Sequence, residues 1–201
     1  MKRRIPAEQR KLEIEEVALR LAFEQGPAHV TTGMIAAELG LTQPAIYKHF
    51  PCKSDIWTEI SKRLSHRITQ NISHALKTEC APNICIRKLI IGHLELIEEC
   101  PALPEFMIMR ETKDGHIILQ NSIQTAMTSF RNALMQNVQA AAKDDIFIRT
   151  IDPEDATTLI FGVIQSLVLR MMVTRNPAIL TADGARLLDL QLAGFLTKGK
   201  E

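Results

Sequence analysis

Residues 31–53 read TTGMIAAELGLTQPAIYKHFPCK, and this stretch carries the main information about the fold. Apolar residues recur at helical spacing on both sides of Gly40. Glycine adopts the left-handed backbone conformation that a sharp turn between two helices requires. We therefore expect short helices over residues 33–39 and 43–49, joined by the turn at Gly40.

Helix-capping signals support these two segments. Thr32 and Thr42 stand where hydroxyl side chains cap helix N-termini, and Pro44 falls in the first turn, where its missing N–H is tolerated. Four apolar side chains can face one another across the bend: Ile35, Leu39, Leu41 and Ile46. The pattern predicts a helix-turn-helix, in which the second helix enters the major groove of DNA.

The exposed side of the second helix is rich in hydrogen-bond donors. Gln43 lies in its first turn, and a glutamine amide can read adenine with two hydrogen bonds. Tyr47 and Lys48 suit phosphate contacts, which fix register more than sequence. The residues expected to contact DNA are Thr31, Thr32, Thr42, Gln43, Pro44, Ala45, Tyr47, Lys48, His49 and Lys53.

Basic residues also gather before this motif, at Lys2, Arg3, Arg4, Arg10 and Lys11. They form either a solvated tail or an arm that adds phosphate or minor-groove contacts. The chain as a whole has a net charge of only +1, so any affinity for DNA must come from such local surfaces.

The composition predicts an all-α protein. Of the 201 residues, 46% are hydrophobic but only 4% aromatic, and no sustained period-two stretch occurs. About nine helices are expected. Two belong to the motif, and the other seven cover residues 7–25, a stretch that begins at 53, and residues 83–99, 103–112, 117–143, 153–175 and 182–198. We expect a DNA-binding domain over residues 1–52 and an effector-binding and dimerisation domain over 53–201, with 53–79 as a connecting helix.

The cysteines and the apolar segments indicate the compartment. Cys52, Cys80, Cys85 and Cys100 form no C-x-x-C pair, so we expect thiols in a reducing cytoplasm, with a redox pair at Cys80 and Cys85 as the less favoured alternative. The charged N-terminus does not read as a signal peptide. We also expect no membrane-spanning segment.

The last two long helices are apolar on more than one side. A helix of this kind must bury two faces, one in its own domain and one against a partner subunit, and Gly162 and Ser166 would allow close helix approach. The residues expected at a dimer interface are Phe161, Ile164, Leu167, Val168, Met171, Leu188, Leu192 and Phe195.

A ligand site is expected among the inner helices, where flexible methionines can adapt to apolar molecules. Ordinary core filling is the alternative for each of these side chains. The candidates are His93, Met107, Arg110, Gln124, Met127 and Phe130. We expect no catalytic residues, metal or cofactor, because the chain lacks a Gly-x-Ser-x-Gly elbow, a phosphate-binding glycine loop and histidines at ligand spacing.

The motif resembles the TetR family of bacterial regulators. The matching residues are Thr31-Thr32, Ile35-Ala36, Leu39-Gly40-Leu41, Ala45-Ile46-Tyr47-Lys48-His49-Phe50 and Lys53. The resemblance covers about residues 10–60, and Gly33 and Cys52 depart from the residue types usual at those positions.

The resemblance implies a homodimeric, cytoplasmic transcription repressor that binds a palindromic operator and is released by a small, largely apolar effector. Two alternatives stay open: a helical small-molecule or lipid carrier with a vestigial DNA-binding motif, and an enzyme that uses Cys100, Glu98 or His93.

Overall fold

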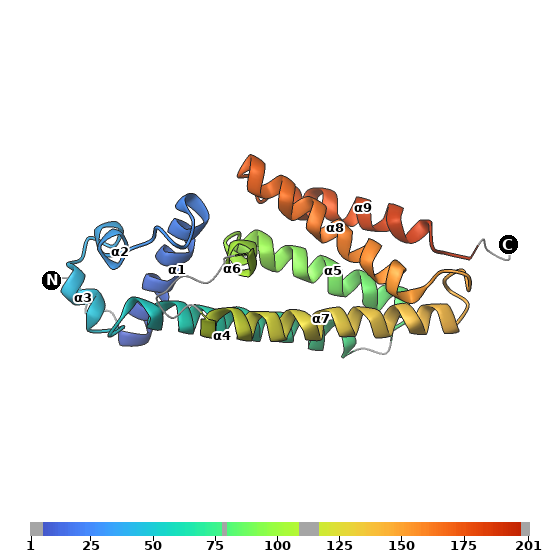
Figure 1. Ribbon diagram of the computed structural model, residues 1–201, viewed down its shortest axis with the longest axis horizontal. Helices are drawn as coiled ribbons and strands as arrows, with labels where there is room; N and C mark the ends of the chain where they lie inside the picture. The colour runs from blue at the N-terminus through green and yellow to red at the C-terminus, as the bar shows by residue number, and fades with distance from the viewer. Residues whose placement is uncertain (1–5, 78–79, 109–116, 198–201) are drawn as a thin grey trace. The chain divides into compact units, whose positions relative to one another are not determined.

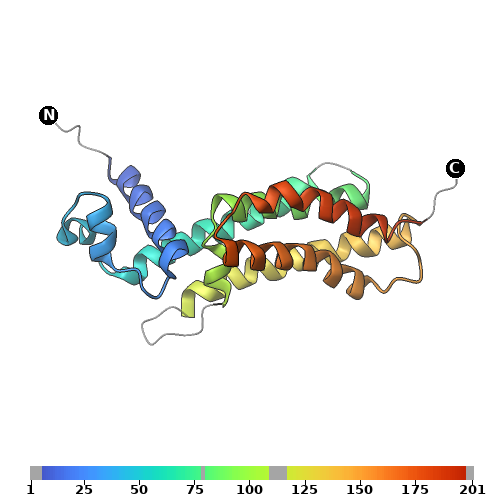
Figure 2. The ribbon, with the colours of Figure 1, turned by 90° about the horizontal axis from the view of Figure 1, so that it is seen from above.

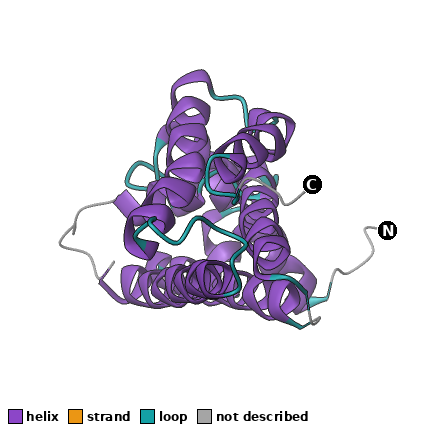
Figure 3. Cartoon of the chain, turned by 90° about the vertical axis from the view of Figure 1, so that its right-hand side faces the viewer, coloured by secondary structure: helices purple, strands orange, loops and turns teal. Residues whose placement is uncertain are grey.

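The computed structural model describes residues 6–77, 80–108 and 117–197. Within these ranges the chain is helical, and no strand is drawn (Figure 3). The elements, labelled in Figure 1, are α1 (Ala7–Gln25), α2 (Thr32–Glu38), α3 (Gln43–Tyr47), α4 (Lys53–Leu76), α5 (Pro82–Glu99), α6 (Leu103–Ile108), α7 (Ile117–Lys143), α8 (Pro153–Thr174) and α9 (Ile179–Ala193). The all-α prediction with about nine helices is confirmed for the described part of the chain.

Most predicted helix boundaries agree to within one or two residues, and those of α9 differ by more. The predicted end of the 103–112 helix lies outside the described residues. Helix α2 begins at Thr32 because Thr31 is its N-cap, whose hydroxyl accepts the N–H of Met34 at 3.2 Å. Helix α3 ends at Tyr47, earlier than expected. Helix α9 starts at Ile179 and ends at Ala193, whereas residues 182–198 were predicted.

The ends of the helices show the expected chemistry at three places. Gly26 ends α1 with φ 86°, and Gly40 follows α2 with φ 61°, both in the left-handed region that favours glycine. Asp152 caps α8 by accepting the N–H groups of Glu154 at 2.8 Å and Asp155 at 3.1 Å.

The chain divides into two compact units that are not continuous in sequence. The first comprises residues 1–65 and 100–124, and the second comprises 66–99 and 125–201. Helix α4 contributes to both.

In the first unit the core joins α1, the start of α4 and α6. Trp57 and Phe106 meet edge to face with ring centroids 5.3 Å apart, and both are buried. Arg63 pairs with the buried carboxylate of Glu15 at 3.0 Å. Burial raises the pKa of Glu15, and the Arg63 charge opposes that rise.

In the second unit α8 and α9 run side by side, as Figures 1 and 2 both show, and α5 packs against them. Gly184 of α9 faces Leu94 of α5 so closely that a side chain there would collide with it. At the surface, Arg87 donates to Asp189 at 2.9 and 3.2 Å. The loop after α7 joins the end of α9 through the Ile148 N–H, which donates to the Phe195 carbonyl at 2.8 Å.

Helix α8 bears on the expectation that no segment spans a membrane. Over Pro153–Thr174 it is long and apolar enough, by length and composition, to cross a bilayer. Length and composition alone do not make a membrane helix, so the expectation stays a prediction. A helix of a folded domain that is covered on two sides has the same length and composition.

Candidate functional site

The two short helices α2 and α3 are fixed by a small apolar core. Ile35, Ile46 and Phe50 are at most 2% exposed. The Leu41 N–H donates to the Ala36 carbonyl at 2.8 Å and closes the turn between the helices. This core sets the face that α3 presents to solvent, since a five-residue helix has little stability of its own.

A polar cluster formed by Thr32, Gln43 and Tyr47 joins α2 to α3. The Gln43 amide nitrogen donates to the Thr32 hydroxyl at 2.8 Å and lies 3.4 Å from the Tyr47 hydroxyl. The Thr32 and Tyr47 hydroxyls are 3.2 Å apart. The cluster therefore holds the Gln43 amide and the Tyr47 ring in a defined arrangement.

Thr32 has a different role from the predicted one. It is the first residue of α2 rather than its cap, and it is only 4% exposed. Its hydroxyl accepts a hydrogen bond from the Gln43 amide and lies 3.2 Å from the Tyr47 hydroxyl, and a phosphate contact at Thr32 stays a prediction. Thr42 does occupy the N-cap position of α3, although its side chain makes no capping bond within the described residues.

The other residues predicted to contact DNA lie at the surface to differing degrees. Tyr47 is 43% exposed, and neither it nor Gln43 or Lys48 is packed inward. Thr31, Thr42 and Pro44 are also exposed, whereas Ala45, His49 and Lys53 are half-buried. The face thus offers amide, hydroxyl and ammonium groups together, which is the donor set that reads bases and phosphates.

The described part of the basic arm is paired within α1. Arg10 binds Glu13 at 2.7 Å and Lys11 binds Glu8 at 3.2 Å. Lys2, Arg3 and Arg4 lie outside the described residues.

A second surface of interest is the outer face of α8 and α9. Leu159, Leu169, Val173 and Leu190 are 52%, 65%, 76% and 70% exposed. Leu159 and Leu190 also line a shallow groove of about 580 Å³, together with Thr158, Gly162, Val163, Gln165, Ser166, Leu187, Gln191 and Gly194. A side chain added at Gly162 would meet open space within the protomer.

The eight side chains predicted for a dimer interface are covered, fully or in part, within the protomer itself. Buried or half-buried inside the second unit are Phe161, Ile164, Leu167, Val168, Met171, Leu188, Leu192 and Phe195. The prediction chose the more apolar side of each helix, and that side faces α5 and the partner helix within the unit. The exposed apolar stripe of α8 contains Gly162 and Ser166, the two small residues at which close helix approach was expected from the sequence.

The interior of the second unit contains a histidine among aromatic rings. His93 is 2% exposed, and its ring lies 4.6 Å from that of Phe130, which in turn lies 6.4 Å from Phe161. Burial lowers the pKa of His93 to about 4, so the imidazole is neutral near pH 7. Its Nδ1 is buried and has no hydrogen-bond partner among the described residues, an arrangement that a polar group of a bound molecule would relieve.

The six predicted ligand residues do not all share this setting. Met127 is buried one turn before Phe130 on α7. Gln124 is exposed, and Met107, half-buried on α6, belongs with Gln124 to the first unit. Arg110 lies outside the described residues. Phe161, expected at the dimer interface, joins the aromatic group around His93.

Of the residues named for a catalytic alternative, Glu98 accepts a hydrogen bond from the Thr181 hydroxyl, and His93 and Cys100 are both buried. Among the described residues, no group of three His, Cys, Asp or Glu side chains is placed to hold a metal ion.

Comparison with known protein families identifies the N-terminal segment. Residues 14–60 match the model described as bacterial regulatory proteins, tetR family. The match begins in α1, includes α2 and α3, and ends in the first turns of α4.

Curated relatives are distant and align over part of their length. The chain is 25% identical over 129 residues to the nucleoid occlusion factor SlmA of Enterobacter sp. (strain 638). It is 24% identical over the same length to SlmA of Citrobacter koseri. Each alignment covers 63% of this chain and 60% of the relative.

Solved structures share the fold over almost the whole chain. The ketosteroid transcriptional regulator KstR2 of Mycobacterium tuberculosis superposes with a TM-score of 0.74 at 15% identity, covering 94% of this chain and 96% of that one. A transcriptional regulator from Saccharomonospora viridis in complex with choline gives a TM-score of 0.74 at 18% identity, covering 95% and 100%. At such identities the likeness establishes the fold.

Proposed function

This chain belongs to the TetR family of bacterial regulatory proteins, and from that premise we propose that it is a repressor that binds a palindromic operator as a homodimer and leaves it when a small effector binds. The observation that carries the proposal is the Thr32–Gln43–Tyr47 cluster, which presents an amide and a phenol from a helix-turn-helix. In a two-fold dimer two such faces would lie about one DNA turn, ~34 Å, apart.

We propose that the dimer forms through the outer faces of α8 and α9. Exposed leucines and valine on these faces are unfavourable in water, and Gly162 and Gly194 leave room for a second backbone to approach. A second copy of the same pair would complete a four-helix contact. The second copy would also cover the exposed apolar side chains of α8, which then need no membrane around them.

We propose that the effector binds in the second unit beside His93, Phe130 and Met127. The neutral imidazole and the surrounding rings favour a molecule with an apolar body and one uncharged hydrogen-bonding group. Structures of similar fold have been solved with choline and with triclosan, which supports a small-molecule effector here. Effector binding would act by favouring one of two arrangements of α4.

The test of DNA binding is selection from a random duplex library, followed by titration of the selected duplex and a scrambled one at several salt concentrations. We expect an inverted repeat, and a binding constant that falls steeply with salt because phosphate contacts release counterions. Binding of apolar molecules without any selected DNA would favour the carrier alternative. The Gln43→Ala and Lys48→Ala proteins test whether binding uses the proposed face. Both are first checked for unchanged helicity and oligomeric state.

A further inference from the structure

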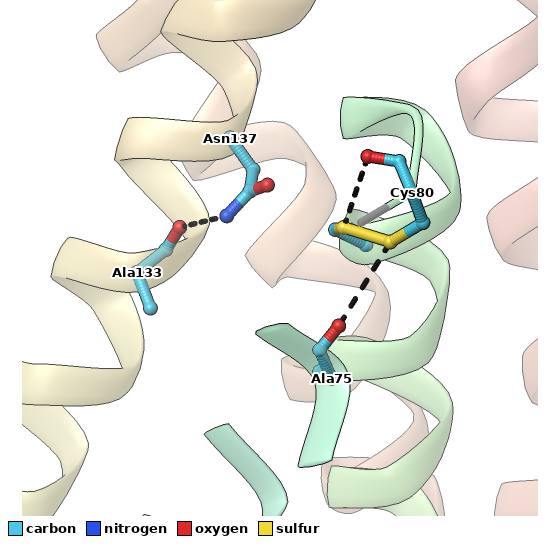
Figure 4. Close-up of a disulfide and its surroundings, with 5 residues drawn as sticks. Ala75, Cys80, Ala133 and Asn137 are labelled. Carbon is cyan, nitrogen blue, oxygen red and sulfur yellow. Dashed lines mark hydrogen bonds between the residues drawn. A yellow bond between two sulfur atoms is a disulfide. The ribbon is translucent and has the colours of Figure 1, made fainter. Parts of the chain in front are cut away.

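A disulfide joins Cys80 and Cys85 at the start of the second unit, where the sequence had favoured two thiols (Figure 4). Cys80 lies in the connection after α4, and Cys85 lies in the first turns of α5. Their Cα atoms are 6.2 Å apart, within the range that a disulfide spans without backbone movement.

We propose that Cys80 and Cys85 form a reversible dithiol–disulfide switch that responds to peroxide and alters operator binding. The functional half of this inference rests on the proposed function. A DNA-binding regulator works in the compartment that holds DNA, and disulfides in reducing compartments are mostly transient or redox-sensing. A disulfide in such a protein therefore points to regulation more than to permanent cross-linking.

The surroundings of the two sulfur atoms accommodate the reduced state as well. The Cys80 Sγ lies 4.0 Å from the carbonyl oxygen of Ala75, and the Cys85 Sγ lies 3.6 Å from the carbonyl oxygen of Cys80 (Figure 4). In the dithiol state each S–H group has an acceptor within reach. Opening the disulfide thus leaves neither thiol without a polar neighbour.

The difference in burial assigns separate roles to the two cysteines. Cys80 is half-buried, whereas Cys85 is only 5% exposed. The Cys80 thiolate attacks one oxygen of hydrogen peroxide, which gives a sulfenic acid at Cys80 and releases hydroxide. The Cys85 thiolate then attacks the Cys80 sulfur, forms the disulfide and expels the second oxygen as hydroxide. With the two thiol protons, both oxygens leave as water; a dithiol reductant reverses the reaction by exchange.

A groove near the pair carries basic side chains. Ala75, beside the Cys80 sulfur, lines this groove of about 450 Å³ between α4 and α5, which also carries His74, Lys88, Glu95 and Arg87, the last of these paired with Asp189. Cys85 is also close to the N-terminus of α5. Basic side chains and helix N-termini both stabilise a thiolate relative to a thiol.

The disulfide lies where the end of α4 leads into α5. It links the connection after α4 to the helix that packs against α8 and α9. Helix α4 runs without interruption from Lys53, at the end of the DNA-binding motif, to Leu76. Making or breaking the link changes how firmly the end of α4 is held.

The experiment uses the full-length protein, reduced and then titrated with hydrogen peroxide. Differential alkylation and mass spectrometry follow each cysteine, and thermal unfolding is measured in both states. We expect Cys80 and Cys85 to oxidise together and reversibly, and the oxidised form to unfold at a higher temperature by a few degrees. The Cys52→Ser/Cys100→Ser protein should behave in the same way, and Cys80→Ser/Cys85→Ser should show neither effect.

Single variants test the assigned roles. Cys85→Ser should retain a sulfenic acid at Cys80 that a dimedone probe labels, while Cys80→Ser should leave Cys85 unlabelled. Persistent thiols at Cys80 and Cys85 under excess peroxide, or preferential oxidation of Cys52, would overturn the redox site.

The effect of the disulfide on DNA binding is tested with the selected operator duplex. Operator affinity should differ at least threefold between fully reduced and fully oxidised wild-type protein, and should not differ in Cys80→Ser/Cys85→Ser. Equal affinities despite complete oxidation overturn the switch. If neither form selects any DNA, the proposed function fails, whereas the alkylation and unfolding measurements still decide the redox site.

Discussion

The two units differ in the surfaces that they present. In the first, Gln43, Tyr47 and Lys48 place polar groups at the surface, and the buried Thr32 holds the Gln43 amide. In the second, the exposed face of α8 and α9 is apolar, and the Nδ1 atom of the buried His93 has no hydrogen-bond partner among the described residues. Water solvates the polar surface well, but contact between water and the apolar face is unfavourable. We therefore expect the second unit to bind another copy on its outer face and a ligand beside His93.

The largest expected effect comes from charging the apolar face. Leu190→Glu would place a carboxylate where the two copies meet, and both copies would have to desolvate it. We expect the dimer dissociation constant to rise at least about 100-fold, or ~3 kcal/mol, measured by sedimentation equilibrium. Leu12→Glu, an exposed leucine on α1, is the matched control and should leave the dimer unchanged. A wild-type monomer at micromolar concentration would contradict the prediction.

The buried imidazole predicts a second effect, on stability against pH. His93 has a pKa of about 4 when folded but close to 6.5 when unfolded, so the unfolded state binds the extra proton first as the pH falls. The free energy of unfolding should therefore decrease from about pH 6.5 down to about pH 4, by up to ~3 kcal/mol from this group.

Urea unfolding of wild type and His93→Leu at pH 7.5, 5.5 and 4.5 measures this effect. The variant should lose less stability on acidification than the wild type. His74→Gln replaces an exposed histidine and should follow the wild-type curve. Parallel pH profiles for wild type and His93→Leu would show that the buried imidazole does not carry the acid sensitivity.

The polar surface predicts a change in DNA preference. Gln43→Ala should cost roughly 1–3 kcal/mol on the selected operator and relax the preference at the bases it contacts. Lys48→Ala should weaken binding to all duplexes alike and reduce the salt dependence. Fluorescence anisotropy on the operator and on single-base variants separates the two. An unchanged base preference in Gln43→Ala would remove it from base reading.

The sequence predicted the first unit's motif well because its determinants are local. Gly40 has to turn the chain, and Ile35 and Ile46 have to meet across that turn, whatever the rest of the chain does. The sequence did not predict the Thr32–Gln43 hydrogen bond in this motif, which joins residues 11 positions apart in the chain. That bond depends on how the two helices are set against each other, so capping rules alone assigned Thr32 to the wrong position.

The second unit was harder to predict because its faces are decided by tertiary packing. Helix α8 is apolar on two sides, and periodicity cannot tell which side faces α5 and which faces outward. Phe161 was therefore assigned to a dimer interface, although its ring lies near that of Phe130. The Cys80–Cys85 pairing likewise follows from the geometry at the start of α5, which a spacing of five residues does not specify.

The smallest expected effect is that of Gly162→Ala, which distinguishes an exposed face of α8 from one covered by a second copy. Within the protomer a side chain at Gly162 meets open space, so the substitution should stabilise the monomeric protein by about 0.5–1 kcal/mol through helix propensity. If a second copy packs there, the added methyl group holds the two backbones apart and dimerisation weakens instead, by about tenfold or ~1.4 kcal/mol. Gly184→Ala, which collides with Leu94 inside the unit, should destabilise the protomer in either case. Sedimentation equilibrium together with urea unfolding measures both quantities, and a more stable Gly162→Ala protein with unchanged dimerisation would place the contact elsewhere.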